Sequence, residues 1–178
     1  MTAPQVRLAR VAAETLLAAL PHRLTHVRGV AAGADALRGH FDATTGDCLV
    51  AAAWLHDIGY APSLQVTGFH PVDGAAFARR EGFAELVVCL VAFHSGAPAE
   101  ARERGISAMS AFARPPQKVV DALTFCDLTT GPDGSAVAPR ERLEEVLQRY
   151  DPDDPVHRAV RSARDELLAT VERVHMWI

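Results

Sequence analysis

The stretch AAAWLHDIGY, residues 51–60, carries the polar pair His56 and Asp57 at the end of an apolar run. The periodicity predicts a helix over residues 46–58. At helical spacing, Asp57 shares one face with Val50, Ala53 and Trp54. We expect that face to turn inward, which would bury the carboxylate. Because a buried carboxylate is costly unless a cation or several donors meet it, the stretch suggests a charged partner inside the fold.

The same combination recurs in three other predicted helices, each with one histidine or aspartate near an end of its apolar face. These are His26 within 22–40, His94 within 84–96 and Asp127 within 116–129. One buried histidine is more often a core residue than a ligand. Four helices that each place a histidine or aspartate on an apolar face favour a shared metal site, because both residue types bind metal ions.

Helical periodicity dominates the rest of the chain, and no run of alternating β-branched residues predicts a strand. We therefore expect an all-α fold. Further helices are predicted at 4–20, 71–81, 104–113, 139–149 and 154–176. Gly59 stands where a helix C-cap glycine is expected. The turn-rich segment 131–135 separates a core at about 22–130 from a C-terminal helical extension at about 135–178, within a single domain spanning 1–178.

Composition narrows the class of protein. The 178 residues carry a formal net charge of −4, so no global basic field attracts nucleic acid, and stable nucleic-acid binding is not expected. The three cysteines lie in apolar runs and suit a reducing compartment. The first twenty residues are too interrupted by charge for a signal peptide or a membrane span. We expect a cytoplasmic protein with no membrane partner.

Two imidazoles and two carboxylates, with no thiolate, suit a divalent ion such as Mn, Fe, Co, Ni or Zn, with Mg also open. Such a ligand set leaves positions for water and for a substrate oxygen. A divalent ion lowers the pKa of water and polarises a phosphoryl oxygen, which indicates hydrolytic chemistry.

His26, the His56–Asp57 pair and Asp127 together resemble the H…HD…D pattern of the HD superfamily of metal-dependent phosphohydrolases, over about residues 22–130. The resemblance implies an all-α core of about five helices. It also implies that His26, His56, Asp57 and Asp127 hold a metal ion. The implied activity is hydrolysis of a phosphoester or phosphoanhydride bond in a small phosphorylated substrate, expected to be a nucleotide.

Two additional histidines resemble those of HD members that bind two metals. His70 opens the segment HPVDGA, and His94 lies in VAFHS. In a two-metal site both are ligands and Asp57 bridges the ions. In a one-metal site both orient the attacking water or the scissile phosphate. The simpler alternatives are a loop residue for His70 and a core histidine for His94, and the number of ions stays open.

Arg23 lies three residues before His26, and a similar Arg-x-x-His occurs in small bacterial HD hydrolases that cleave dinucleoside polyphosphates. Arg23 is thus a candidate phosphate clamp, with a surface arginine as the alternative. Arg114 and Lys118 are vaguer phosphate candidates. Asp73 fits the first turn of a helix better than a catalytic base.

Other interpretations stay open. The chain could be a non-catalytic sensor that binds metal or nucleotide, or, less in keeping with the motifs, a di-iron oxygenase on the HD fold. The predicted C-terminal helix either packs on the core or forms the seam of a homodimer. Tyr60 is followed by Ala61, so the GYP extension of cyclic-di-GMP phosphodiesterases is missing.

Overall fold

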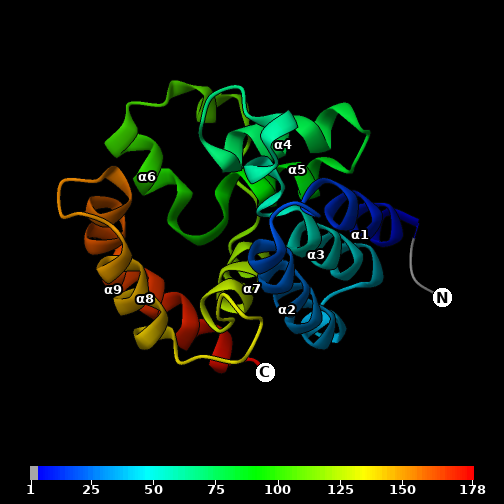
Figure 1. Cartoon of the computed structure of the whole chain (residues 1–178). Coiled ribbons are helices and arrows are strands. Elements are labelled where there is room, and N and C mark those ends of the chain that lie inside the picture. The colour runs from blue at the N-terminus through cyan, green and yellow to red at the C-terminus, as the bar shows by residue number, and fades with distance from the viewer. Residues whose placement is uncertain (1–3) are drawn as a thin grey trace.

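The computed structural model describes residues 4–178 and is all-α, as predicted, with no β-strand in that range (Figure 1). The helices are α1 (Pro4–Leu16), α2 (Pro21–Leu37), α3 (Ala43–Leu55), α4 (His70–Arg80), α5 (Glu85–Phe93), α6 (Ala97–Arg104), α7 (Gln117–Leu128), α8 (Pro139–Arg149) and α9 (Pro155–His175). Short 3-10 turns join several of them. No helix within this range combines the length and apolar character needed to cross a bilayer.

Helix α3 lies at the centre, packed against α1, α2, α5 and α7. From Cys48 to Leu55 its side chains are apolar, and all of them except Trp54 are buried. An apolar surface on all sides is what a helix surrounded by other helices requires. The Asp42 side chain caps its start by accepting from the backbone N–H groups of Thr44 and Thr45, each at 3.1 Å. The helix therefore begins three residues earlier than predicted and ends at Leu55, leaving His56 and Asp57 at its exit.

Gly59 is not the left-handed C-cap residue that we predicted, because its φ is not positive. It lies in the 3-10 turn Ile58–Tyr60, which packs on the start of α4. A Cβ on Gly59 would lie 2.1 Å from the carbonyl oxygen of His70. The glycine is needed because two backbone segments meet there, and this close approach carries His70 toward Asp57.

The prediction of one helix over 104–113 is wrong. Helix α6 ends at Arg104, where that segment begins, and Gly105 with a φ of 67° is its left-handed C-cap. A separate 3-10 turn, Ser107–Ala111, follows. The predicted helix 84–96 also stops early, at Phe93, since Ser95 takes a φ of 44°.

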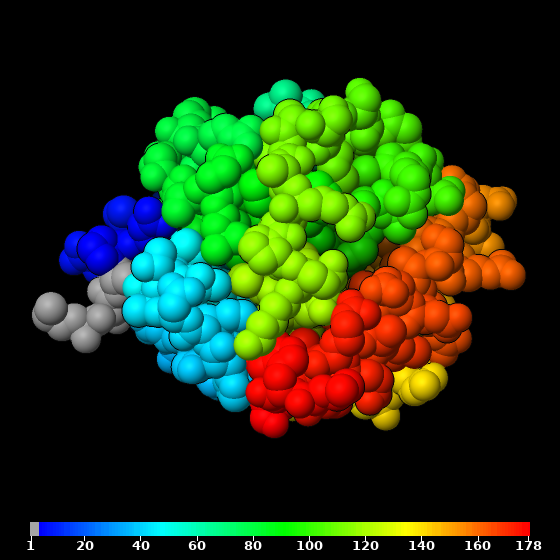
Figure 2. Space-filling model, turned by 180° about the vertical axis from the view of Figure 1, so that it is seen from behind, coloured from blue at the N-terminus to red at the C-terminus, as the bar shows by residue number. Residues whose placement is uncertain are grey.

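The C-terminal helix α9 packs on the rest of the chain, against α6, α7 and α8 (Figure 1). Arg173 donates to both carboxylate oxygens of the buried Asp121 on α7, at 2.7 and 3.0 Å. The ring of Trp177 packs edge to face on the ring of Phe41. Figure 2 shows the C-terminal end of the chain (red) lying against the segment around residue 40 (cyan) and against α7 (yellow-green). Of the two alternatives for this helix, packing on the core is the one observed, and a homodimer stays a prediction.

Candidate metal centre

Four helices bring histidine and aspartate side chains to one buried point. His26 comes from α2, while His56 and Asp57 follow the end of α3. His70 begins α4 and His94 follows α5. These residues form two triads, and within each triad the possible ligand atoms all lie within 4.8 Å of one another. One triad is His26, His56 and Asp57, and the other is Asp57, His70 and His94. Asp57 belongs to both.

The Asp57 carboxylate faces a different triad with each oxygen. Its Oδ2 lies 3.4 Å from His56 Nε2 and 4.0 Å from His26 Nε2. Its Oδ1 lies 3.4 Å from His70 Nε2. Arg23 donates to Oδ2 at 2.6 Å. Burial alone would raise the pKa of Asp57, but the charges of Arg23 and His56 outweigh it and hold the pKa well below its usual value. The group is thus an ionised carboxylate with both oxygens available.

Three of the histidines are held in one orientation by the backbone. In each, Nδ1 faces a carbonyl oxygen, which can only accept, so Nδ1 carries the proton and Nε2 points into the centre. The bonds run from His26 to Gly131 at 3.1 Å, from His56 to Ala53 at 2.8 Å and from His94 to Val91 at 2.7 Å. The fully buried Nε2 of His56 has no hydrogen-bond partner in the described part of the chain. A buried polar atom without a partner is what a cation would satisfy.

His70 and His94 face each other, with their Nε2 atoms 3.3 Å apart. Burial lowers the pKa of both rings. Both are therefore neutral at pH 7 and keep the lone pair that a metal ligand needs. The Tyr60 ring stacks on His70 with centroids 4.1 Å apart, and the guanidinium of Arg23 lies 4.1 Å from the Tyr60 centroid on that ring's face.

Asp127 contacts the centre through His26. Its Oδ1 lies 3.0 Å from His26 Nε2, but Asp127 belongs to neither triad. Its Oδ2 accepts a hydrogen bond from the Ser95 hydroxyl, and Ser95 N donates to Thr124 Oγ1 at 3.1 Å. Within the described residues, Ser95 is the only non-glycine with positive φ. Sequence reasoning missed it, because neither composition nor spacing signals that backbone conformation.

The remaining candidates have other surroundings. Lys118 donates to the carbonyl oxygen of His40 and lies over the Trp177 ring, so it does not reach the centre. Arg114 lines a different cavity. The Asp73 carboxylate accepts from the backbone N–H groups of residues 66–68 and braces that loop. Asp73 lies in the first turn of α4, as predicted, and its carboxylate is engaged by this loop and not by the centre.

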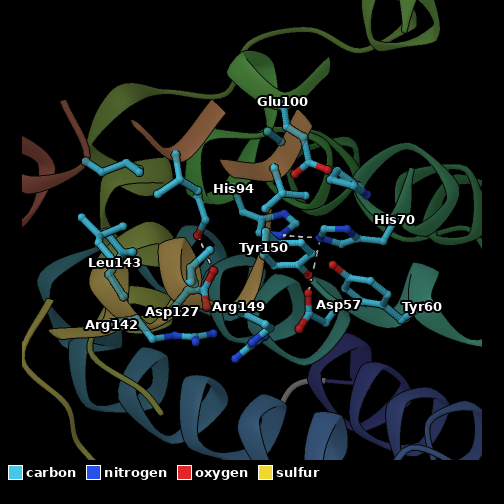
Figure 3. A pocket seen from close by; sticks show the side chains of 18 of the residues that line it. Asp57, Tyr60, His70, His94, Glu100, Asp127, Arg142, Leu143, Arg149 and Tyr150 are labelled. Atoms are coloured by element: carbon cyan, nitrogen blue, oxygen red, sulfur yellow. Dashed lines mark hydrogen bonds and ion pairs between the residues drawn. The ribbon is translucent and has the colours of Figure 1, made fainter. Parts of the chain in front are cut away.

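The centre opens into a cavity of about 120 Å³ (Figure 3). Asp57, His70, His94 and Asp127 lie on one wall. The facing wall comes from the C-terminal extension, with side chains that sequence reasoning assigned to no site. On α8 and directly after it these are Arg142, Leu143, Val146, Arg149 and Tyr150.

The donor set fits a divalent metal ion. Two donors about 2.1 Å from one ion are separated by about 3.0 Å at right angles and about 3.4 Å at the tetrahedral angle. The Asp57 oxygens lie 3.4 to 4.0 Å from three imidazole nitrogens. His26 Nε2 also lies 3.0 Å from Asp127 Oδ1. The atoms are imidazole nitrogens and carboxylate oxygens, which suit Mn, Fe, Co, Ni or Zn. The cluster therefore has the chemistry and the spacing of a divalent metal site.

Comparison with family models finds a match to the HD domain over residues 23–162, most of the chain. The matched range contains every histidine and aspartate of the centre and all of α8. Comparisons with curated proteins and with solved structures find no match.

Proposed function

The chain belongs to the HD domain family, and from that membership we propose that it is a metal-dependent phosphohydrolase acting on a phosphoester or phosphoanhydride bond of a nucleotide. One observation carries the proposal: the Asp57 carboxylate is shared by two triads and faces one with each oxygen. A carboxylate that only stabilised the fold would not need four imidazoles around it.

The proposed centre holds two ions. His26, His56 and Asp57, with Asp127 beside His26, would hold one ion, and Asp57, His70 and His94 the other. When bound, divalent ions supply the Lewis acidity that activates a water molecule and draws charge from a phosphoryl oxygen. Nitrogen-rich coordination favours Mn, Fe, Co, Ni or Zn over Mg.

The protein's own groups have defined tasks in this proposal. Arg23 lies beside Asp57, lines the cavity and keeps 27% of its side-chain surface exposed, so it can also contact a substrate oxygen. Its guanidinium would neutralise charge that develops on the phosphoryl group. Tyr60 stacks on His70 and limits the positions that this ring can take.

The test is hydrolysis of a nucleotide panel by protein loaded with each metal, beside Asp57→Asn. Asp165→Asn, an exposed aspartate on α9, is the matched control. We expect wild type and D165N to release phosphate and to bind two ions per chain, and D57N to lose both. Equal turnover by D57N would reject the assignment. Nucleotide binding without turnover in every metal would indicate a sensor, and oxygen consumption by the iron form would indicate an oxygenase.

A further inference from the structure

The cavity wall opposite the metal centre carries two arginines, Arg142 and Arg149 on α8. They are seven residues apart and therefore lie on the same helix face. Both line the cavity that also contains Asp57 and Asp127 (Figure 3). Arg142 is only 8% exposed. A buried arginine usually has a dedicated anionic partner, because burying its charge is otherwise costly.

The same two arginines line a second hollow together with His26. The described residues around it are three arginines, two histidines and one proline: Arg23, Arg142, Arg149, His22, His26 and Pro132. No carboxylate is among them. The guanidinium groups of Arg23, Arg142 and Arg149 therefore line one hollow together.

These cations are only partly neutralised within the described chain. Arg23 is paired with Asp57. Arg142 and Arg149 both pair with the single carboxylate of Glu145, whose side chain is 41% exposed. Two guanidinium groups against one exposed carboxylate leave a net positive charge, and a phosphate with more oxygens can take the place of Glu145.

We propose that Arg142 and Arg149 bind a second phosphate, next to the one attacked at the metal centre, so that the substrate is a diphosphate or a longer phosphoanhydride. The inference rests on the proposed function. In the reaction, the oxygen of water bonds to the attacked phosphorus and the bond to the bridging oxygen breaks. The bridging oxygen leaves with the arginine-bound phosphate, and the protons of water pass to the products and solvent.

Beside the arginines, the cavity wall is apolar. Leu143, Val146 and Tyr150 follow one another on the neighbouring stripe of α8, and α9 adds Val160 and Leu167. An organic group attached to the phosphate chain would find a stacking ring and aliphatic contacts there. A nucleoside diphosphate should therefore bind more tightly than inorganic pyrophosphate, which has no group for this wall.

The first experiment measures binding to metal-free protein in EDTA by calorimetry, with inorganic tripolyphosphate and orthophosphate as probes. Wild type should bind tripolyphosphate at least about tenfold more tightly than orthophosphate, and Arg149→Gln should weaken tripolyphosphate binding about tenfold, the scale of a charge-assisted hydrogen bond. Arg149 is preferred to the buried Arg142 because it lies at the rim and its loss should not impair folding. Arg140→Gln, exposed on the same helix and outside the cavity lining, should bind like wild type.

The second experiment measures turnover of ADP and of p-nitrophenyl phosphate, which has one phosphate. R149Q should raise KM about tenfold for ADP and leave kcat/KM for p-nitrophenyl phosphate within about twofold. Equal losses on both substrates, or equal binding of tripolyphosphate by R149Q and R140Q, would overturn the inference and leave the hydrolase assignment intact. Binding that depends on Arg149, with no hydrolysis by the wild type, would instead refute the proposed function alone.

Discussion

Replacing Gly59 with alanine should disable the metal centre without touching any of its side chains. The new Cβ would lie 2.1 Å from the carbonyl oxygen of His70 and 2.8 Å from Gly74 N, whereas real Cβ contacts hardly ever fall below 3.0 Å. Both obstacles are backbone atoms, so no side chain can rotate away. The turn Ile58–Tyr60 and the start of α4 must separate by about 1 Å, which moves His70 away from Asp57 Oδ1, now 3.4 Å distant.

The expected cost has two parts. A displacement of about 1 Å at a catalytic group can reduce turnover by about a hundredfold. Forced overpacking of a close contact destabilises a fold by about 1–3 kcal/mol. We would measure kcat/KM of the metal-loaded enzyme and the free energy of unfolding in urea. Gly39→Ala is the control, because nothing lies within 4 Å of a Cβ at that position.

Gly74→Ala crowds the same contact less severely than Gly59→Ala, because its Cβ would lie 3.2 and 3.3 Å from its nearest neighbours. The variant therefore shows the effect of mild crowding in a protein that still folds. It should fold and show a smaller decline than G59A. If G59A matched G39A in both activity and stability, the close approach of the turn to α4 would not be what positions His70, and the reasoning would be refuted.

Three further predictions concern the surroundings of the ions. Ser95→Gly removes the hydroxyl that donates to Asp127 but suits a φ of 44°, so kcat/KM should fall about tenfold while the melting temperature is unchanged or higher; a joint loss of stability would indicate a merely structural role. Burial alone would lower the pKa of His56, but the charge of Asp57 raises it to about 9, so in the metal-free protein this ring is protonated at pH 7 and an incoming ion must displace the proton. Affinity for Mn²⁺ should therefore rise by up to about tenfold per pH unit from about pH 6 to pH 8 and level off above about 9; a calorimetric dissociation constant that did not change with pH would contradict this. Glu145→Gln removes the carboxylate that competes for Arg142 and Arg149, so it should tighten tripolyphosphate binding several-fold, and weaker binding would mean that Glu145 is needed to orient the arginines.

Local periodicity was enough to predict the helices and the polar side chains at their inner ends. Val50 and Trp54 share a face whatever the tertiary structure, because that relation depends only on the helical repeat, and Asp57 follows directly at the exit of α3. The helix expected at 71–81 is observed as α4 (His70–Arg80) for the same reason. That His26 and His94 meet at Asp57 could be anticipated because each lies on an apolar helix face. His70 was expected there only from the resemblance of HPVDGA to two-metal HD members.

Features set by the backbone's path could not be predicted in this way. The segment 104–113 has a helical composition, but Gly105 ends α6 in a left-handed conformation. Gly59 has the position of a helix cap, and only the arrival of α4 shows that a side chain would not fit. Ser95 became recognisable as a neighbour of Asp127 only once α5 and α7 were placed side by side.

The contribution of the C-terminal extension was missed for a related reason. On its own, α8 is a charged amphipathic helix whose arginines resemble an ordinary solvated face. Arg142 and Arg149 become candidates for phosphate binding only because the fold places α8 in the wall of the cavity that contains Asp57. Which charged residues of a surface helix face a cavity depends on long-range packing, which local periodicity does not encode.

The most direct test of the metal centre is anomalous diffraction from crystals grown with Mn²⁺, recorded on both sides of its absorption edge. We expect one peak among His26, His56 and Asp57 and a second between Asp57 and the pair His70 and His94, joined by the one carboxylate. Crystals saturated with the ion that show no peak beside Asp57, or whose imidazoles point away from it, would contradict the account.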